Sequence, residues 1–208
     1  MWYPILVAFL VSYLLGNLNG AVCMSAFLGR EDVRSHGSGN AGLTNFVRNY
    51  GSAKAILVVL IDVGKTVLAC LVGGLLLTPY GLTKEGQVLG AFGATLGHDF
   101  PALLGFRGGK GILCGISAAT VIDWRIALIL FAVFCVSYAF TGYVSLGSVL
   151  GAAANCIAFA CFHWNQPWVA AGGILLGLLA IFMHRSNIVR LCKGTESKTS
   201  LLRKEKQK

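Results

Sequence analysis

Long runs of apolar residues, separated by short polar segments, alternate along the whole chain. A helix that crosses a bilayer needs about 20 mostly apolar residues, whereas soluble helices and sheets show one-sided or alternating patterns instead. The pattern therefore predicts an all-α polytopic membrane protein with seven transmembrane helices in one domain, residues 1–208. The predicted spans are Trp2 to Leu28, Ala53 to Leu77, Gln87 to about Leu104, Gly111 to Ile122 (short for a bilayer core), Ile126 to Phe140, Leu146 to Phe162 and Trp168 to Met183.

The positions of the basic residues predict how the chain is oriented. Cytoplasmic loops carry an excess of Lys and Arg, so the orientation that gathers most of them on one side is favoured. With the amino terminus outside, only Lys84 and Arg125 lie outside and Lys65 lies within a span, while a basic tail of about residues 185–208 is cytoplasmic. The distribution of basic residues also supports the short fourth span, Gly111 to Ile122. Without this span the chain would cross the membrane once less, and the basic tail would lie outside. The inner residues are Arg30, Arg34, Arg48, Lys54, Arg107, Lys110 and every Lys or Arg from Arg185 onward.

Composition excludes several other classes of protein. The chain is 56% apolar and 12% charged, and much of its net charge of +9 lies in the tail, where it sets topology and meets anionic lipids. The sequence contains no alternation of basic and aromatic residues, which is the pattern that would indicate binding to nucleic acid. The seven cysteines form no C-x-x-C pair, and the four histidines are scattered, so we expect reduced cysteines, no metal and no cofactor.

The stretch GSGNAG, within Gly37 to Arg48, has the spacing of a dinucleotide-binding turn. That turn requires a preceding strand in a soluble βαβ unit, whereas this one follows an apolar run. It is not a P-loop either, because Leu-Thr-Asn follows it in place of the Gly-Lys-Ser or Gly-Lys-Thr that would close such a loop. In the predicted topology it shares the inner face with three other polar segments, 97–111, 141–148 and 184–190. Glycine amides, Arg and Lys together suit phosphate oxygens. The four segments therefore predict phosphate binding at a membrane interface.

Four strings closely resemble the successive motifs of the bacterial acyl-phosphate:glycerol-3-phosphate acyltransferases of the PlsY type: GSGNAGLTNFVR, GHDFPALLGFRGGKG, YVSLGS and HRSNIVRLCKGTE. The resemblance covers nearly the whole chain. It departs from the usual pattern at Ala41, Leu43, Leu113 and Cys114, which concerns loop rigidity and acyl-chain fit more than the reaction.

The resemblance implies an enzyme of phospholipid biosynthesis in the bacterial inner membrane, with its active site at the cytoplasmic face. It would transfer a fatty acyl group from acyl phosphate to the 1-hydroxyl of sn-glycerol 3-phosphate, giving lysophosphatidic acid and phosphate. Its partners would be these two substrates, membrane lipids and a soluble enzyme that makes acyl phosphate.

Residue roles follow from the same resemblance. Ser38 and Arg48 are expected to hold the glycerol phosphate, Lys110 to contact phosphate, and His184 with Asn187 to position the reacting hydroxyl or its proton. Whether His184 or a substrate phosphate accepts that proton stays open. The full expectation is a catalytic set of Lys110, His184 and Asn187, and a substrate-binding set of Ser38, Gly39, Asn40, Thr44, Asn45, Arg48, Gly108, Gly109, Gly111 and Ser145.

Other polar residues inside or beside the apolar runs have separate interpretations. Asp62 and Lys65 lie three residues apart within the second run, where an unpaired charge is unfavourable. They form either a structural ion pair or a support for the polar pocket. Asn17 and Asn19 are expected to form hydrogen bonds between helices, and the His98-Asp99 pair is expected to brace the loop that follows it.

Two rival functions remain at this stage. A transporter of phosphorylated solutes would also gather phosphate-binding residues, but it needs access from both sides, and the predicted external loops offer almost no basic residues. An acyltransferase that uses acyl-CoA or acyl carrier protein would need a His-x-x-x-x-Asp dyad. None of His36, His98, His163 and His184 has an aspartate five positions later.

Overall fold

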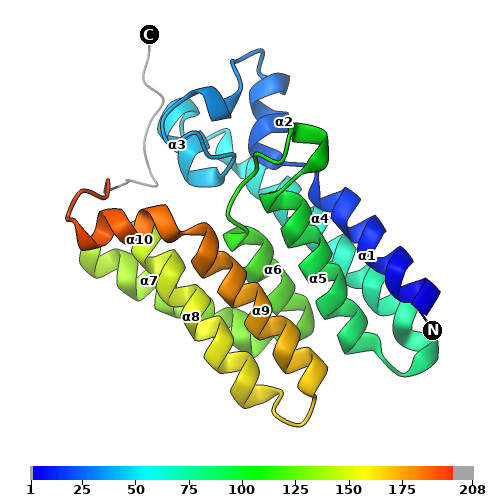
Figure 1. The fold of residues 1–208 in the computed structure, drawn as a ribbon. Helices are drawn as coiled ribbons and strands as arrows, with labels where there is room; N and C mark the ends of the chain where they lie inside the picture. Colours follow the sequence, from blue (N-terminus) through cyan, green and yellow to red (C-terminus); the bar gives the residue numbers. More distant parts are fainter. Residues whose placement is uncertain (1, 199–208) are drawn as a thin grey trace.

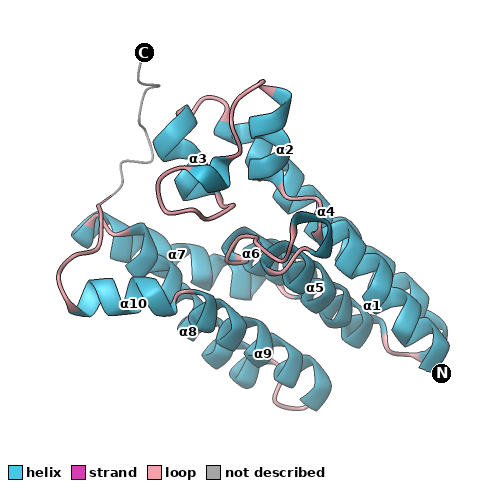
Figure 2. Cartoon of the chain, turned by 45° about the horizontal axis from the view of Figure 1, so that its top comes forward, coloured by secondary structure: helices cyan, strands magenta, loops and turns pink. Residues whose placement is uncertain are grey.

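Helices and short connecting loops make up residues 2–198, the part of the chain that the computed structural model describes, and no strand occurs there (Figures 1 and 2). Three 3-10 turns lie in these loops: η1 (Val33–Ser35), η2 (Thr78–Tyr80) and η3 (Ala102–Leu104). In chain order the helices are α1 (Trp2–Gly16), α2 (Gly20–Phe27), α3 (Leu43–Tyr50), α4 (Ala55–Leu77), α5 (Thr83–Asp99), α6 (Ile112–Ile122), α7 (Trp124–Thr141), α8 (Val144–Phe162), α9 (Pro167–Met183) and α10 (Arg185–Cys192).

The long helices form two groups that the short helix α6 joins (Figure 1). Helices α1, α4 and α5 pack together on one side, α7, α8 and α9 on the other, and α6 contacts members of both groups. Close packing of α5 depends on glycine: a Cβ at Gly90 would collide with the Ala69 carbonyl of α4, and one at Gly97 with the Tyr13 carbonyl of α1. Small residues of this kind let helix backbones approach one another in a membrane.

Four stretches are long and apolar enough to cross a membrane: Trp2–Phe27, Ala55–Tyr80, Trp124–Thr141 and Val144–Phe162. The pair α9 and α10, bent by 57° at their junction, would make a fifth span. Large apolar side chains on these helices are exposed, which fits a surface in contact with lipid. The chain is thus an all-helical integral membrane protein with four or five apolar spans among its described residues. The predicted spans Gln87–Leu104 and Gly111–Ile122 are not among them.

The first predicted span, Trp2 to Leu28, agrees with the apolar stretch Trp2–Phe27, but this stretch is not one continuous helix, because α1 and α2 are separated at Asn17–Asn19. The Asn19 side chain accepts a hydrogen bond from the Val22 amide (3.1 Å) at the start of α2 and donates one to the Ala41 carbonyl (3.0 Å). The Asn17 side chain accepts one from the Leu103 amide (3.0 Å). Both asparagines therefore form hydrogen bonds, but with the polar loops and with the helices next to them in sequence, so the expected bonds between helices are not confirmed.

Asp62 and Lys65 of α4 form an ion pair of 2.8 Å (Oδ1 to Nζ) at this break. The Lys65 ammonium also donates to the carbonyls of Gly16 (3.1 Å) and Leu18 (2.8 Å), where α1 ends. The Asp62 carboxylate accepts from the Gly20 amide (3.1 Å), where α2 begins. Backbone groups freed inside a membrane need such partners. The pair thus replaces the hydrogen bonds missing at the break, as a structural ion pair would, and Asp62 also lines the cavity described below.

The remaining boundaries agree with the predicted runs to within a few residues, with three differences. Helix α5 begins at Thr83 and ends at Asp99 rather than near Leu104, because the next-but-one residue, Pro101, cannot continue a helix. Helix α3 forms within the polar segment that follows GSGNAG. Helix α10 forms the start of the predicted tail, of which residues 199–208 lie outside the described residues.

Candidate active site

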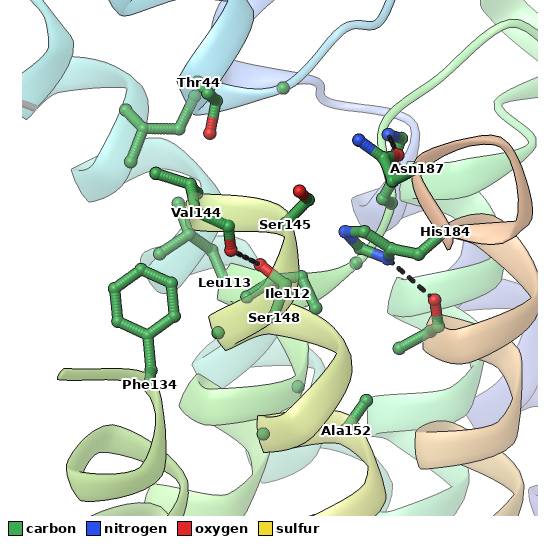
Figure 3. A pocket seen from close by; sticks show the side chains of 18 of the residues that line it. Thr44, Ile112, Leu113, Phe134, Val144, Ser145, Ser148, Ala152, His184 and Asn187 are labelled. Carbon is green, nitrogen blue, oxygen red and sulfur yellow. Dashed lines mark hydrogen bonds between the residues drawn. The ribbon is translucent and has the colours of Figure 1, made fainter. Parts of the chain in front are cut away.

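A cavity of about 390 Å³ lies between the two groups of helices, at the end of the bundle where the polar loops gather. Its upper part is polar, and its lower part runs between α6, α7, α8 and α9 (Figure 3). Ten of the predicted site residues line it: Ser38, Asn40, Thr44, Asn45, Arg48, Lys110, Gly111, Ser145, His184 and Asn187. Gly39, Gly108 and Gly109 do not.

Four helices begin at this cavity. Thr44 lies in the first turn of α3, Ile112 begins α6, Ser145 lies in the first turn of α8, and His184 immediately precedes α10. No side chain among residues 2–198 caps the start of any of these four helices. The first turn of a helix presents unpaired N–H groups and the positive end of the helix dipole, which favours a bound anion. The backbone alone therefore makes the upper part of the cavity attractive to negative charge.

Cationic side chains add to this field. Arg48, Lys110 and Arg190 all line the cavity. Within the described residues, the Lys110 ammonium makes one hydrogen bond, to the side-chain oxygen of Asn187, and no ion pair. Burial, followed by repulsion from Arg190, lowers the pKa of Lys110 to about 8, although Glu196 acts in the opposite direction. A bound phosphate would offset this repulsion, because its negative charge would attract the Lys110 ammonium.

His184 sits at the bend between α9 and α10, with its ring directed into the cavity (Figure 3). Its Nδ1 lies 2.8 Å from the Ala180 carbonyl, which can only accept, so Nδ1 carries the proton of the neutral ring. Burial lowers the pKa of His184 to about 4. The imidazole is therefore neutral near pH 7, and its Nε2 has a lone pair that can accept a hydrogen bond from a hydroxyl.

Glu196 is a member of the site that the sequence analysis did not single out. Its carboxylate accepts hydrogen bonds from the Ser145 hydroxyl (2.9 Å), the Asn187 amide (2.8 Å) and Arg190 Nε (2.6 Å). Burial would raise the pKa of Glu196, but these three hydrogen bonds outweigh it and the pKa lies below its ordinary value. One signal was available: Glu196 is the only acidic residue in the stretch 184–198 and ends the fourth motif string.

Asn45 holds the first polar loop in shape. Its amide nitrogen donates to the carbonyls of Val33 (2.9 Å), His36 (3.1 Å) and Asn40 (3.0 Å), and its oxygen accepts from the Ser38 amide (3.1 Å). The side chain is buried, at 2% exposure, so its hydrogen-bonding capacity is used by the loop rather than offered to a ligand. Asn45 thereby presents the neighbouring Ser38 and Asn40 to the cavity.

The Gly-Gly-Lys-Gly segment rests on the end of α5. The Gly109 amide donates to the His98 carbonyl (3.0 Å), and a Cβ on Gly109 would collide with the His98 imidazole. On the other side, Gly111 lies against the Asp99 carboxylate, whose oxygens have no hydrogen-bond partner among the described residues. His98 thus braces the loop as predicted, whereas the Asp99 side chain forms no hydrogen bond with it among the described residues. Gly109 allows the loop to pack closely, which places Lys110 at the cavity wall.

Comparisons with known proteins all indicate the same family. A sequence profile of the family described as glycerol-3-phosphate acyltransferase matches residues 6–194. Similar proteins include the glycerol-3-phosphate acyltransferases of Thermoanaerobacter pseudethanolicus, 38% identical over 196 residues (94% of this chain, 96% of the relative), and Clostridioides difficile, 36% identical over 197 residues (94% and 96%).

Two crystal structures of PlsY (YgiH), described as an integral membrane glycerol 3-phosphate acyltransferase, have the same fold. The glycerol 3-phosphate form superposes with a TM-score of 0.85 and the lysophosphatidic acid form with 0.80. Each is 28% identical in sequence and covers 95% of this chain and 96% of its own.

Proposed function

This chain belongs to the glycerol-3-phosphate acyltransferase family, and we propose that it transfers a fatty acyl group from acyl phosphate to the 1-hydroxyl of sn-glycerol 3-phosphate. The products are lysophosphatidic acid and inorganic phosphate, in phospholipid biosynthesis. The related PlsY structures, in glycerol 3-phosphate and lysophosphatidic acid forms, support this pair of substrate and product.

The observation that carries the proposal is the division of one cavity into an anion-binding upper part and an apolar lower part. Both substrates carry a phosphate, and one also carries a long acyl chain. Four uncapped helix starts together with Arg48, Lys110 and Arg190 suit two phosphates held near each other. The apolar walls between α6 and α9 suit the acyl chain.

Each binding residue has a proposed partner. Ser38 and Arg48, beside the start of α3, hold the phosphate of glycerol 3-phosphate. Lys110, at the start of α6, contacts the phosphates of both substrates, with Asn187 fixing the ammonium. Ser145 lines the opposite wall, where it can contact the acyl phosphate when its hydroxyl turns from Glu196 to the phosphate.

In the reaction, the oxygen of the 1-hydroxyl attacks the acyl carbonyl carbon, and the bond from that carbon to the phosphate oxygen breaks. His184 accepts a hydrogen bond from the attacking hydroxyl through Nε2 and thereby orients it. The hydroxyl proton leaves with the released phosphate, either directly or by way of His184. Phosphate is already a good leaving group, so most of the rate enhancement comes from holding the two anions in position and stabilising the developing oxyanion.

The wider setting is proposed on the same basis. The chain forms one domain with seven membrane crossings, in which the buried helix α5 and the short helix α6 complete the count. The amino terminus lies outside and the site faces the cytoplasm of a bacterial inner membrane, beside the basic tail. Membrane lipids surround the bundle, and a soluble enzyme supplies acyl phosphate. No metal or cofactor takes part.

A donor assay tests this function. Purified protein in lipid or detergent is given glycerol 3-phosphate with palmitoyl phosphate, in the presence of a chelator and without coenzyme A, and lysophosphatidic acid is measured. We expect product from acyl phosphate and none from palmitoyl-CoA. Product from palmitoyl-CoA alone would contradict the donor assignment. Uptake of glycerol 3-phosphate into vesicles without acyl transfer would instead favour a transporter.

A further inference from the structure

The lower part of the cavity ends inside the bundle rather than passing through it. Leu130 of α7, Asn155 of α8 and Leu176 of α9 line its far end. Leu130 and Leu176 also belong to the main buried cluster of the protein, together with Ile126 and Phe159, which are almost fully buried. Side chains therefore fill the space beyond this point.

A hydrogen bond between α8 and α9 lies at the same depth of the cavity. The Asn155 side chain donates to the Gly173 carbonyl at 2.7 Å and so joins α8 to α9 across the end of the cavity. Asn155 lies ten residues beyond Ser145 on α8, which is about 15 Å at 1.5 Å of rise per residue. Ser145, Ser148 and Ala152 follow one another down this helix along the cavity (Figure 3). The cavity thus has a definite depth below its reactive groups.

Three glycines of α8 and α9 line the cavity, and they differ in how much room each one has. A Cβ at Gly147 would meet the Phe134 ring at 2.9 Å, and one at Gly177 would collide with Cys156 and with the Ala152 carbonyl. A Cβ at Gly151 would meet only the Leu130 carbonyl, at an ordinary contact distance of 3.7 Å. Of these three positions, Gly151 alone leaves room for a side chain without a shift of its neighbours. Any longer side chain there would extend into the cavity.

From this geometry we propose that Gly151, together with the floor of Leu130, Asn155 and Leu176, sets the longest acyl chain that the enzyme accepts. The inference rests on the proposed function, because it takes the acyl chain of the donor as the occupant of the lower cavity. A chain that fills the space down to Asn155 replaces water and gains apolar contacts with α7, α8 and α9. A chain longer than the cavity meets the packed core.

The test is the change of donor preference in Gly151→Leu. The measured quantity is kcat/KM for decanoyl phosphate divided by kcat/KM for palmitoyl phosphate. A leucine side chain shortens the cavity, so this ratio should rise by at least about tenfold, since even one methylene in an apolar pocket gives differences of this order. Activity with decanoyl phosphate and the melting temperature show whether the variant is folded, because a misfolded variant loses activity with both donors.

Gly64→Leu is the matched control. Gly64 is an exposed glycine of α4 that does not line the cavity, and a Cβ there has nothing within 4 Å. This variant should keep the wild-type ratio. In the opposite direction, Leu130→Ala lowers the floor and should raise the use of stearoyl phosphate relative to palmitoyl phosphate.

The outcomes separate this inference from the function on which it rests. An unchanged ratio in a Gly151→Leu protein that melts like wild type would overturn the role of Gly151 while leaving the transferase intact. Wild-type protein that transfers no acyl group from any acyl phosphate would overturn the proposed function itself.

Discussion

Two lysines near the same end of the bundle have opposite surroundings. Lys65 is 4% exposed and its ammonium is saturated by Asp62, by two carbonyls at the end of α1 and by His98 Nδ1 at 2.9 Å. Lys110 lines the cavity with one neutral hydrogen-bond partner, and the repulsion from Arg190, Arg48 and Arg185 is offset only in part by Glu196. A charge whose partners are all within the protein serves the fold. A charge surrounded by like charges indicates a binding site for an anion.

The largest effect is expected at the saturated lysine. Lys65→Met leaves the Asp62 carboxylate buried without its cation and frees the carbonyls that end α1. Breaking such a pair destabilises a protein by about 3–5 kcal/mol. We expect a large drop in melting temperature and poor recovery of folded protein. Lys193→Met, at an exposed position, is the control. A Lys65→Met protein that melts like wild type would show that the pair does not hold the break together.

The second largest effect is expected at Lys110, where activity should fall while the melting temperature does not. Lys110→Met removes the cation from the cavity wall without breaking an ion pair, so the melting temperature should stay near that of wild type. Transfer should fall by about a hundredfold or more, which is typical for the loss of one group that stabilises charge in a transition state. Steady-state assays and thermal melts on the same preparation make the comparison. Wild-type turnover in a folded Lys110→Met protein would exclude Lys110 from the site.

The pH dependence of kcat/KM gives a further test of the role of Lys110. Because the pKa of Lys110 is lowered to about 8, its ammonium loses its proton as the pH rises through that value. The kcat/KM for glycerol 3-phosphate, which reports on the free enzyme, should therefore fall above about pH 8. Lys110→Arg keeps its charge at any such pH and should lack this fall. The same decline in both proteins would assign it to another group.

The smallest effect concerns Glu196. Its negative charge raises the pKa of Lys110, in opposition to burial and to the arginines. Glu196→Gln keeps an acceptor for Ser145 and Asn187 but removes the charge, so the pH at which activity declines should move lower. The same pH series measures the shift. A midpoint that moves higher would mean that Glu196 does not act on Lys110 through its charge.

Much of the fold and of the candidate site could be predicted from sequence. Apolar runs predicted the bounds of α4, α6, α7, α8 and α9 to within a few residues, although α4 contains Asp62 and Lys65 and α6 has only 11 residues. The break after Gly16 could not be seen in the same way, because it depends on partners from α4 that lie more than forty residues along the chain. The hydrophobic pattern from Trp2 to Leu28 alone does not indicate which residues of α4 contact the break.

The site shows the same limit. Motif resemblance named ten residues that line the cavity, but it could not separate those that face a ligand from those that shape a loop. Asn45 and Gly109 belong to the second kind, and this became visible only from their hydrogen bonds and close packing. Glu196 was missed for the opposite reason, since its role depends on three partners from two helices.

The most direct test of the central contrast is the labelling of the two lysines by an amine-reactive acylating reagent, with and without glycerol 3-phosphate. Peptide mass spectrometry reads the extent of modification at each lysine over a pH series. The account predicts that Lys110 is modified with a midpoint near pH 8 and is protected by glycerol 3-phosphate, while Lys65 stays unmodified in the folded protein. Equal modification of Lys110 with and without glycerol 3-phosphate would contradict it.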